Sequence, residues 1–199
     1  GIGNRSPFAT TKVKAYLNDI PLTNGIGETS IEDIDLSIVD KIEVWKGPTA
    51  SRYGAGLGGM IQLQTAENRG EGGAFSSSFN MASYGLYRFV NELQYSDAAQ
   101  KWMTYLNYNN LHSDGYRANN QYNRSSLTFY NEMAVKDAEL SFLLNYTDLK
   151  AFIPSSLNET DFADEPTKAA FTWASVKGFE DYTKWLAGVS YKRSIFTGL

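Results

Sequence analysis

The chain has 199 residues, with 18 Lys and Arg against 22 Asp and Glu and a formal net charge of −4 at pH 7. A nucleic-acid binder usually carries a basic excess, which this chain lacks. The absence of cysteine excludes a disulfide scaffold and a thiolate zinc site. No stretch approaches the roughly 18–20 apolar residues that a membrane-spanning helix needs.

Aromatic residues are distributed unevenly along the chain. Residues 1–68 hold only four of them, and the remainder of the 13 Tyr, 11 Phe and 4 Trp lie further on. Polar and glycine-rich residues at 68–73 separate the two parts. We therefore predict one domain over residues 1–68 and a second over residues 69–199.

The first part has the pattern of a small α+β unit. Residues 22–29 are polar and contain glycine, which predicts a loop. The isoleucine spacing and early acids of residues 30–40 predict one or two helical turns, with Ser30 as the cap. Alternating apolar and polar residues predict strands at 13–17, 41–46 and 60–65.

The second part is a series of alternating segments, each about ten residues long. In residues 139–147 the even positions are apolar and the odd positions are mostly polar. The pattern predicts six antiparallel strands, at residues 73–83, 86–96, 100–111, 123–133, 139–147 and 184–192.

The connections between these strands alternate in length. Those at 97–99 and 135–138 are short, those at 113–122 and 150–183 are long, and only the turn at 84–85 breaks the rule. Together with the alternating faces, this is typical of a transmembrane β-barrel, in which lipid requires a closed sheet. A soluble antiparallel sandwich or a lipocalin-like barrel is the alternative. On the barrel interpretation, Leu140, Phe142, Leu144 and Tyr146 face lipid and Ser141, Asn145 and Thr147 face the lumen.

Residues that could carry catalysis are sparse. The string from Gly54 to Gly59 fits G-x-G-x-x-G, but a strand-like run follows it instead of a helix, so we interpret it as a turn. The carboxylates between Glu28 and Asp40 lack the order of a calcium loop and are interpreted as a solvated helix start. Without a nucleophile, base and orienting group, we predict no enzyme, catalytic residue, metal site or intrinsic cofactor.

Three motifs occur in order along the first part. They are Tyr16 to Leu22, the run Ile42 to Pro48 that fits I-E-V-x-[RK]-G-P, and Tyr53-Gly54 followed by Gly58 to Ile61. This set resembles the C-terminal part of the plug domain of TonB-dependent outer-membrane receptors, running into the first barrel strands. Within that family it is most similar to receptors for iron complexes of the ferric-citrate kind.

The resemblance implies a mainly β fold, with an α+β plug fragment at 1–68 and the first six or so antiparallel transmembrane barrel strands at 69–199. Six strands cannot close a barrel when a plugged transporter needs about 22, so we expect a piece of a longer receptor. The implied location is the bacterial cell outer membrane.

The resemblance also implies a receptor that takes up a ferric chelate, of the siderophore or ferric citrate type. Its implied partners are a TonB-type energy-transducing protein, the lipid bilayer and lipopolysaccharide, and the iron chelate as cargo, with no nucleic acid. Two alternatives stay open: a TonB-dependent transporter of cobalamin, heme or an oligosaccharide, and a non-transport barrel or sandwich protein for interaction or adhesion.

Site residues follow from the same resemblance. Arg5 is the first candidate for the ligand, because a guanidinium binds carboxylates bidentately; a plug–barrel ion pair is its alternative role. Aromatic residues of the loop 150–183 either stack on a ligand or pack the loops together. The ligand-binding candidates are Arg5, Thr23, Asn24, Glu28, Tyr116 and Arg117, and the candidates for plug–barrel contacts are Glu43, Lys46 and Arg52.

Overall fold

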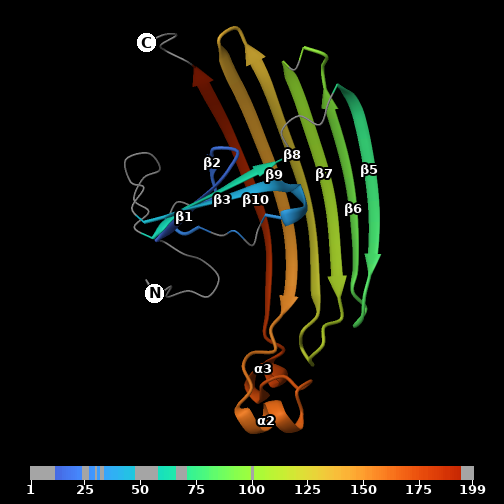
Figure 1. Ribbon diagram of the computed structural model, residues 1–199. Helices are drawn as coiled ribbons and strands as arrows, with labels where there is room; N and C mark the ends of the chain where they lie inside the picture. The colour runs from blue at the N-terminus through green and yellow to red at the C-terminus, as the bar shows by residue number, and fades with distance from the viewer. Residues whose placement is uncertain are drawn as a thin grey trace.

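The computed structural model describes residues 12–23, 27–29, 31, 34–47, 58–65, 71–99 and 101–193. Its strands form two sheets, and the chain is mainly β, as the alternation predicts (Figure 1). We call the four-stranded sheet, ordered β2-β1-β4-β3, the small sheet, and the six-stranded sheet, ordered β10-β9-β8-β7-β6-β5, the large sheet.

The small sheet contains all three strands that the sequence predicts in the first part. β1 pairs in parallel with β4, and β4 pairs antiparallel with β3. Asn18 and Asp19 take left-handed φ angles of 46° and 69° in the tight turn that leads to β2, a conformation these residues tolerate. The strands are β1 (Val13–Leu17), β2 (Ile20–Pro21), β3 (Val39–Lys46) and β4 (Gly59–Thr65).

The helix prediction for residues 30–40 is wrong in extent, because the described part is a single 3-10 turn, η1 (Leu36–Ile38). Asp35 caps this turn by accepting a 2.8 Å hydrogen bond from the backbone N–H of Ser37. The chain then becomes extended at Val39, because the next residues pair with β4. The predicted cap, Ser30, lies outside the described residues.

The large sheet is antiparallel throughout, and its strands confirm the six predicted ones. β9 and β10 are longer than the alternation suggested, because cross-strand pairing continues through charged positions such as Lys150 opposite Asp181. The strands are β5 (Gly72–Met81), β6 (Tyr87–Ser96), β7 (Trp102–Ser113), β8 (Tyr122–Val135), β9 (Ala138–Phe152) and β10 (Phe179–Arg193).

The two ends of the large sheet differ in their connections. At one end, which we call the turn end, short turns join β6 to β7 and β8 to β9. At the other, the loop end, residues 153–178 carry α2 (Glu159–Asp164) and α3 (Phe171–Val176), which lie beyond the strands (Figure 1). The sequence interpretation missed both helices, although Asn158 caps α2 by accepting a 2.7 Å bond from Asp161 N–H. None of the described helices has the length and apolar character needed to cross a membrane.

The two faces of the large sheet have opposite chemistry. The face turned away from the small sheet, here the outer face, exposes large apolar side chains, which include Phe75, Phe79, Phe89, Leu93, Leu127, Phe142, Trp185 and Val189. The face that packs on the small sheet, the inner face, buries polar side chains, among them Asn107, Asn109, Ser126, Thr128, Asn145 and Thr147. The predicted alternation of β9 is confirmed: Ser141, Asn145 and Thr147 are buried on the inner face, and Phe142 is 38 % exposed on the outer face.

One apolar cluster joins the sheets. Leu143 interrupts the polar inner face of β9 and is fully buried in this cluster. Burial of this kind is the main favourable term in packing one sheet on another. The buried members are Ala15, Leu17, Ile20, Leu22, Ile34, Ile38 and Leu63 from the small-sheet region and Tyr105, Tyr130 and Leu143 from the large sheet.

Candidate functional site

The central contact between the sheets lies on one cross-strand row of the inner face. Strand register places Gln94, Tyr105, Tyr130, Leu143 and Gly188 side by side from β6 to β10. The two tyrosines keep their hydroxyls satisfied on neighbouring carboxylates: Tyr105 donates to Glu92 at 3.1 Å, and Tyr130 donates to Glu132 at 2.7 Å. The rings therefore supply apolar area to the small sheet without leaving a buried hydroxyl unpaired.

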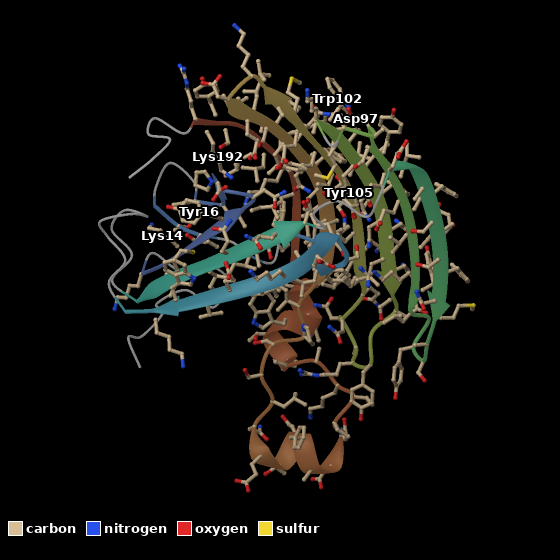
Figure 2. All side chains as sticks on the ribbon, turned by 45° about the horizontal axis from the view of Figure 1, so that its top comes forward. Lys14, Tyr16, Asp97, Trp102, Tyr105 and Lys192 are labelled. Atoms are coloured by element: carbon tan, nitrogen blue, oxygen red, sulfur yellow. The ribbon has the colours of Figure 1, made fainter. Side chains whose placement is uncertain are left out.

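The β1–β2 turn is seated on β10. A Cβ atom at Gly188 would lie 2.4 Å from Ile20 Cγ2, so only glycine leaves room for this isoleucine. Four residues further along the same face, Lys192 forms an ion pair with Asp19 of the turn and lies 3.4 Å from Glu139 on β9. Figure 2 shows Lys192 beside the small sheet, near the turn end marked by Asp97 and Trp102.

A second charged contact joins the η1 region to β6. Arg88 Nη2 lies 2.6 Å from Asp35 Oδ1, and Asp35 is only 6 % exposed. Beside it, Asn109 on β7 donates a long 3.5 Å hydrogen bond to Ser37 Oγ. The prediction of a solvated carboxylate is therefore wrong for Asp35. This side chain is buried, and the guanidinium of Arg88 on the opposing sheet compensates its burial.

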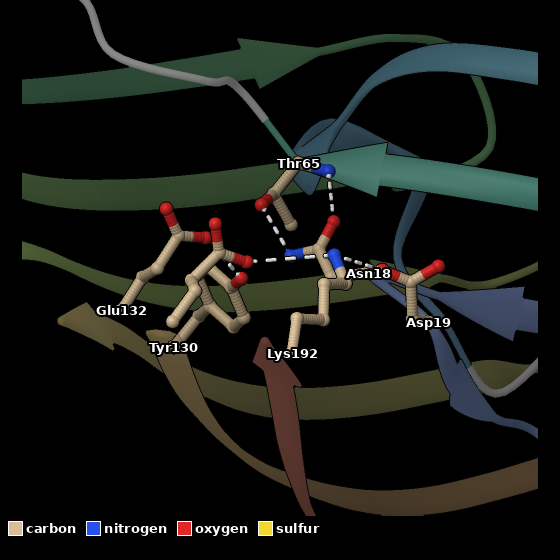
Figure 3. A network of polar contacts seen from close by, with 7 residues as sticks. Asn18, Asp19, Thr65, Tyr130, Glu132 and Lys192 are labelled. Carbon is tan, nitrogen blue, oxygen red and sulfur yellow. Dashed lines mark hydrogen bonds and ion pairs between the residues drawn. The ribbon is translucent and has the colours of Figure 1, made fainter. Parts of the chain in front are cut away.

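A polar cavity of about 300 Å³ lies between the sheets, on the turn-end side of the row that contains Tyr130. Figure 3 shows its hydrogen-bonded wall, where Asn18 Nδ2 donates to Thr65 Oγ1 at 2.7 Å and Thr65 N–H donates to Asn18 Oδ1 at 2.9 Å. Two further lining atoms, Gln62 Oε1 and Ser96 Oγ, have no hydrogen-bond partner, although their residues are only 5 % and 2 % exposed. A cavity with such lining suits water or a hydrophilic solute.

The long connection at the loop end is held together by residues that precede β8. Arg117 donates from Nε to the carbonyl of Lys168 at 3.0 Å and from Nη1 to that of Ser155 at 2.7 Å. Asn119 donates to the carbonyls of Ile153 and Gly178, both at 2.9 Å. The structure thus brings the predicted ligand residue Arg117 to the loop 153–178 as a positioning group.

The surface of this loop is rich in exposed apolar rings. Phe171 is 85 % exposed and Phe162 is 68 % exposed. Tyr116, a predicted ligand residue in the neighbouring β7–β8 connection, makes an edge contact with Tyr84, with ring centroids 5.3 Å apart.

Within the loop 153–178, the hydrogen bond from Lys168 Nζ to Asp161, at 2.5 Å, raises the pKa of Lys168.

The other predicted site residues are placed as follows. Thr23 pairs with Thr29 across the loop that contains Glu28, through a backbone bridge and a 2.9 Å contact between their hydroxyls. Glu43 lies 2.9 Å from Lys41 on its own strand, and Lys46 is exposed. Arg5, Asn24 and Arg52 lie outside the described residues.

The sequence interpretation did not single out the ion pairs that join the sheets in the structure. Asp19 lies within the motif Tyr16 to Leu22, and Arg88 and Lys192 lie in predicted strands, but none of these positions signals an ion pair. A usable signal is the interruption of the polar inner face by Leu143 and Gly188, which marks where the small sheet packs. Within the part of the chain that the structure describes, no group of three or more acidic or histidine side chains could hold a metal ion.

Known proteins share both the sequence pattern of the first part and the arrangement of the two sheets. The family model described as the TonB-dependent Receptor Plug Domain matches residues 1–61. The unliganded structure of the ferric citrate transporter FecA is similar to 96 % of this chain, with a TM-score of 0.73 and 19 % sequence identity. Residues 1–61 match the plug-domain family, and the chain has the fold of the corresponding part of the FecA structure.

Other structures share this TonB-dependent receptor fold with different cargoes. The pyoverdine outer membrane receptor FpvA from Pseudomonas aeruginosa PAO1 is similar to 69 % of the chain and the copper transporter OprC to 72 %, at TM-scores of 0.56 and 0.59 and identities of 18 % and 17 %. The chain spans only 30 % of the FecA chain, 21 % of FpvA and 24 % of OprC. All three of these similar proteins are transporters or receptors, not enzymes.

Proposed function

We propose that the chain is part of a bacterial outer-membrane receptor that takes up a ferric chelate, with energy supplied by a TonB-type protein. The observation that carries the proposal is the docking of a plug sequence, the small sheet, on the polar inner face of a sheet whose outer face is apolar. This is the arrangement that a plugged transmembrane barrel requires.

The distribution of aromatic side chains supports the membrane assignment. Outer-face rings lie toward both ends of the large sheet: Tyr87 stacks on His112 at 4.9 Å toward the loop end, and Tyr95 and Trp102 are exposed toward the turn end. Transmembrane barrels carry such aromatic girdles at both interfaces, and their longer loops are extracellular. We therefore place the loop end outside the cell and the turn end in the periplasm. Outer-face rows then meet lipid and the sugar headgroups of lipopolysaccharide.

The chelate would be recognised outside, where the loop end meets the plug. Glu28 and Thr23 on the plug, and Tyr116 with the loop that Arg117 positions, are our candidates among the described residues, together with Arg5 and Asn24. A siderophore or ferric citrate is favoured as cargo because FecA, a ferric citrate transporter, and FpvA, a pyoverdine receptor, share the fold. The iron chelate is substrate, and no intrinsic cofactor is part of the proposal.

Growth on defined iron sources tests the function. A strain lacking the full-length gene should lose growth on one of ferric citrate, a ferric hydroxamate or a ferric catecholate, and regain it when the gene is restored. Loss of growth on cobalamin, heme or an oligosaccharide, with all iron sources unaffected, would replace iron with that cargo. No phenotype on any of them would favour an interaction or adhesion protein.

The role of Arg5 is tested on the purified full-length receptor. If Arg5 contacts an anionic chelate, Arg5→Ala should weaken binding about ten- to a hundredfold, the loss expected for a charge-assisted hydrogen bond of roughly 1.5–3 kcal/mol. The melting temperature should stay near that of the wild type. If Arg5 is a plug–barrel ion-pair partner instead, the melting temperature falls and the affinity is retained.

A further inference from the structure

The contact of the plug with the large sheet is firm on the β10 side. Ile20 fills the space left by Gly188, and Leu186 on the same strand packs against the shared apolar cluster. Lys192 adds the ion pair with Asp19, which Glu139 supports from β9. Separation here would expose the apolar area of Ile20 and Leu186 to water, so this side resists opening.

Apart from Tyr105, which belongs to the shared apolar cluster, the contact on the β6–β7 side is polar and incompletely bonded. Buried atoms without a hydrogen-bond partner are concentrated here: Gln94 Oε1 and Ser96 Oγ on β6, Asn107 Nδ2 and Asn109 Oδ1 on β7, and Gln62 Oε1 on the facing strand β4. Buried polar atoms are normally bonded to protein or water, and the adjoining cavity has room for water. We call these five residues the polar seam.

At its loop end, the region of the polar seam is closed by polar contacts. They are the Asp35–Arg88 ion pair at 2.6 Å and the long Asn109–Ser37 hydrogen bond at 3.5 Å. Such bonds can be exchanged for bonds to water as two surfaces separate, whereas apolar contacts are simply lost. The β6–β7 side is therefore the easier one to open.

We propose that the plug remains attached to β10 while it separates from the polar seam, and that the seam is the passage for a hydrophilic ferric chelate. This rests on the proposed function. The five seam side chains are uncharged amides and a hydroxyl, which both donate and accept hydrogen bonds. They can take the place of water around a polar solute without holding either charge tightly.

Cross-linking in the full-length receptor tests the proposal, and this chain contributes no cysteine of its own. At β10, the Ile20→Cys and Gly188→Cys pair suits a disulfide. A Cβ at position 188 would lie 2.4, 3.1 and 3.2 Å from Ile20 Cγ2, Cδ1 and Cγ1. The two Cβ atoms then lie within about 4 Å, inside the usual range of about 3.5–4.5 Å.

The matched pair closes the seam side. Ser37→Cys and Asn109→Cys replace residues that are already in contact, and a short bifunctional thiol reagent would join them. Uptake of radiolabelled ferric citrate, or of the chelate identified by growth, is measured before linking, after linking and after cleavage of the link. We expect the β10 link to leave most uptake intact, and the seam link to reduce it at least about tenfold and reversibly.

The outcomes separate the two proposals. If the unlinked receptor imports no ferric chelate, the proposed function fails. If import occurs but the seam link leaves it unchanged, or the β10 link abolishes it, the seam passage is overturned. If a double-cysteine variant does not fold, single cysteines can be labelled in intact cells instead. Ser96→Cys should react with a hydrophilic maleimide faster during uptake, whereas the reaction rate of Ile20→Cys should not change. Equal rates at both positions would also overturn the passage.

Discussion

The small and large sheets bury opposite kinds of side chain. In the small sheet the fully buried residues are apolar, such as Leu17, Met60 and Leu63. In the large sheet most of the fully buried side chains are polar, such as Asn107 and Thr128, and large apolar ones are exposed on the outer face. On the proposed function, the medium on each side explains the difference: the small sheet excludes water from its own core, and the large sheet turns its apolar face to lipid.

The polar inner face is stable because its side chains bond to one another across strands. Asn145 on β9 donates to Thr128 on β8 at 2.8 Å, and Tyr105 on β7 donates to Glu92 on β6 at 3.1 Å. Bonds of this kind compensate burial without apolar packing. The contrast between the sheets is therefore open to test by substitutions that affect one and spare the other.

The largest expected effect is in the small sheet. Leu17→Ala in the full-length receptor should lower the free energy of unfolding of the plug by about 2–5 kcal/mol, because it leaves a cavity in a fully buried site. Urea titration followed by protease sensitivity of the plug measures this loss. Leu17→Met keeps the volume and should cost under about 1.5 kcal/mol. Equal losses for both variants would show that packing at Leu17 does not matter.

The matching substitution in the large sheet is Phe142→Arg. If the outer face lies in lipid, this substitution should cost about 2–4 kcal/mol in folding into vesicles. Asp148→Arg, on the same face of β9 but toward the loop end, should cost only about 0–1 kcal/mol. If Phe142→Arg were as mild as Asp148→Arg, the outer face would not lie in lipid.

The junction between the sheets is probed by Gly188→Ala. The added methyl group would meet Ile20 and should cost about 1–3 kcal/mol of plug docking through overpacking. Differential scanning calorimetry of the receptor provides the measurement. Removing the Ile20 side chain as well should make the double variant less destabilised than the sum of the two single ones; additive effects would refute the contact.

A smaller effect is expected for Arg117→Ala at the loop end. Its guanidinium donates to part-buried carbonyls of residues 153–178. Their hydrogen bonds can be replaced by bonds to water, so the loss of stability should be about 1 kcal/mol and local to this loop. Hydrogen exchange should rise in this loop and not in β8 or β9. Lys177→Ala, whose side chain is on the loop surface, is the control. Unchanged exchange with a loss of chelate binding would instead make Arg117 a ligand residue.

The smallest expected effect is a pH dependence of the same loop. The bond to Asp161 raises the pKa of Lys168 above its ordinary value of 10.5, so the folded loop holds this proton more tightly than the unfolded one. The stabilisation is complete below pH 10.5 and is lost as the pH rises through the raised pKa. Trp173 fluorescence or loop hydrogen exchange should show this loss, and Asp161→Asn should abolish it.

Much of the large sheet could be predicted from the sequence, and less of the candidate site. The alternation around Phe142 located β9 and its apolar outer face, because successive side chains of a strand point to opposite sides. The prediction was poorer for α2 and α3, where six-residue helices carry little periodic signal and depend on loop contacts. It was also poorer at Asp35, whose burial depends on Arg88 in the other sheet.

The order of motifs and the period of two in this chain were enough to indicate a plug sequence followed by strands of a membrane barrel. Both are local properties, set by which residues are neighbours along the chain. The pairing of Asp19 with Lys192, the fit of Ile20 against Gly188, and the unbonded polar atoms of the seam are not local. They arise only when one sheet is laid on the other, because a strand pattern tells which way a side chain points but not what it meets.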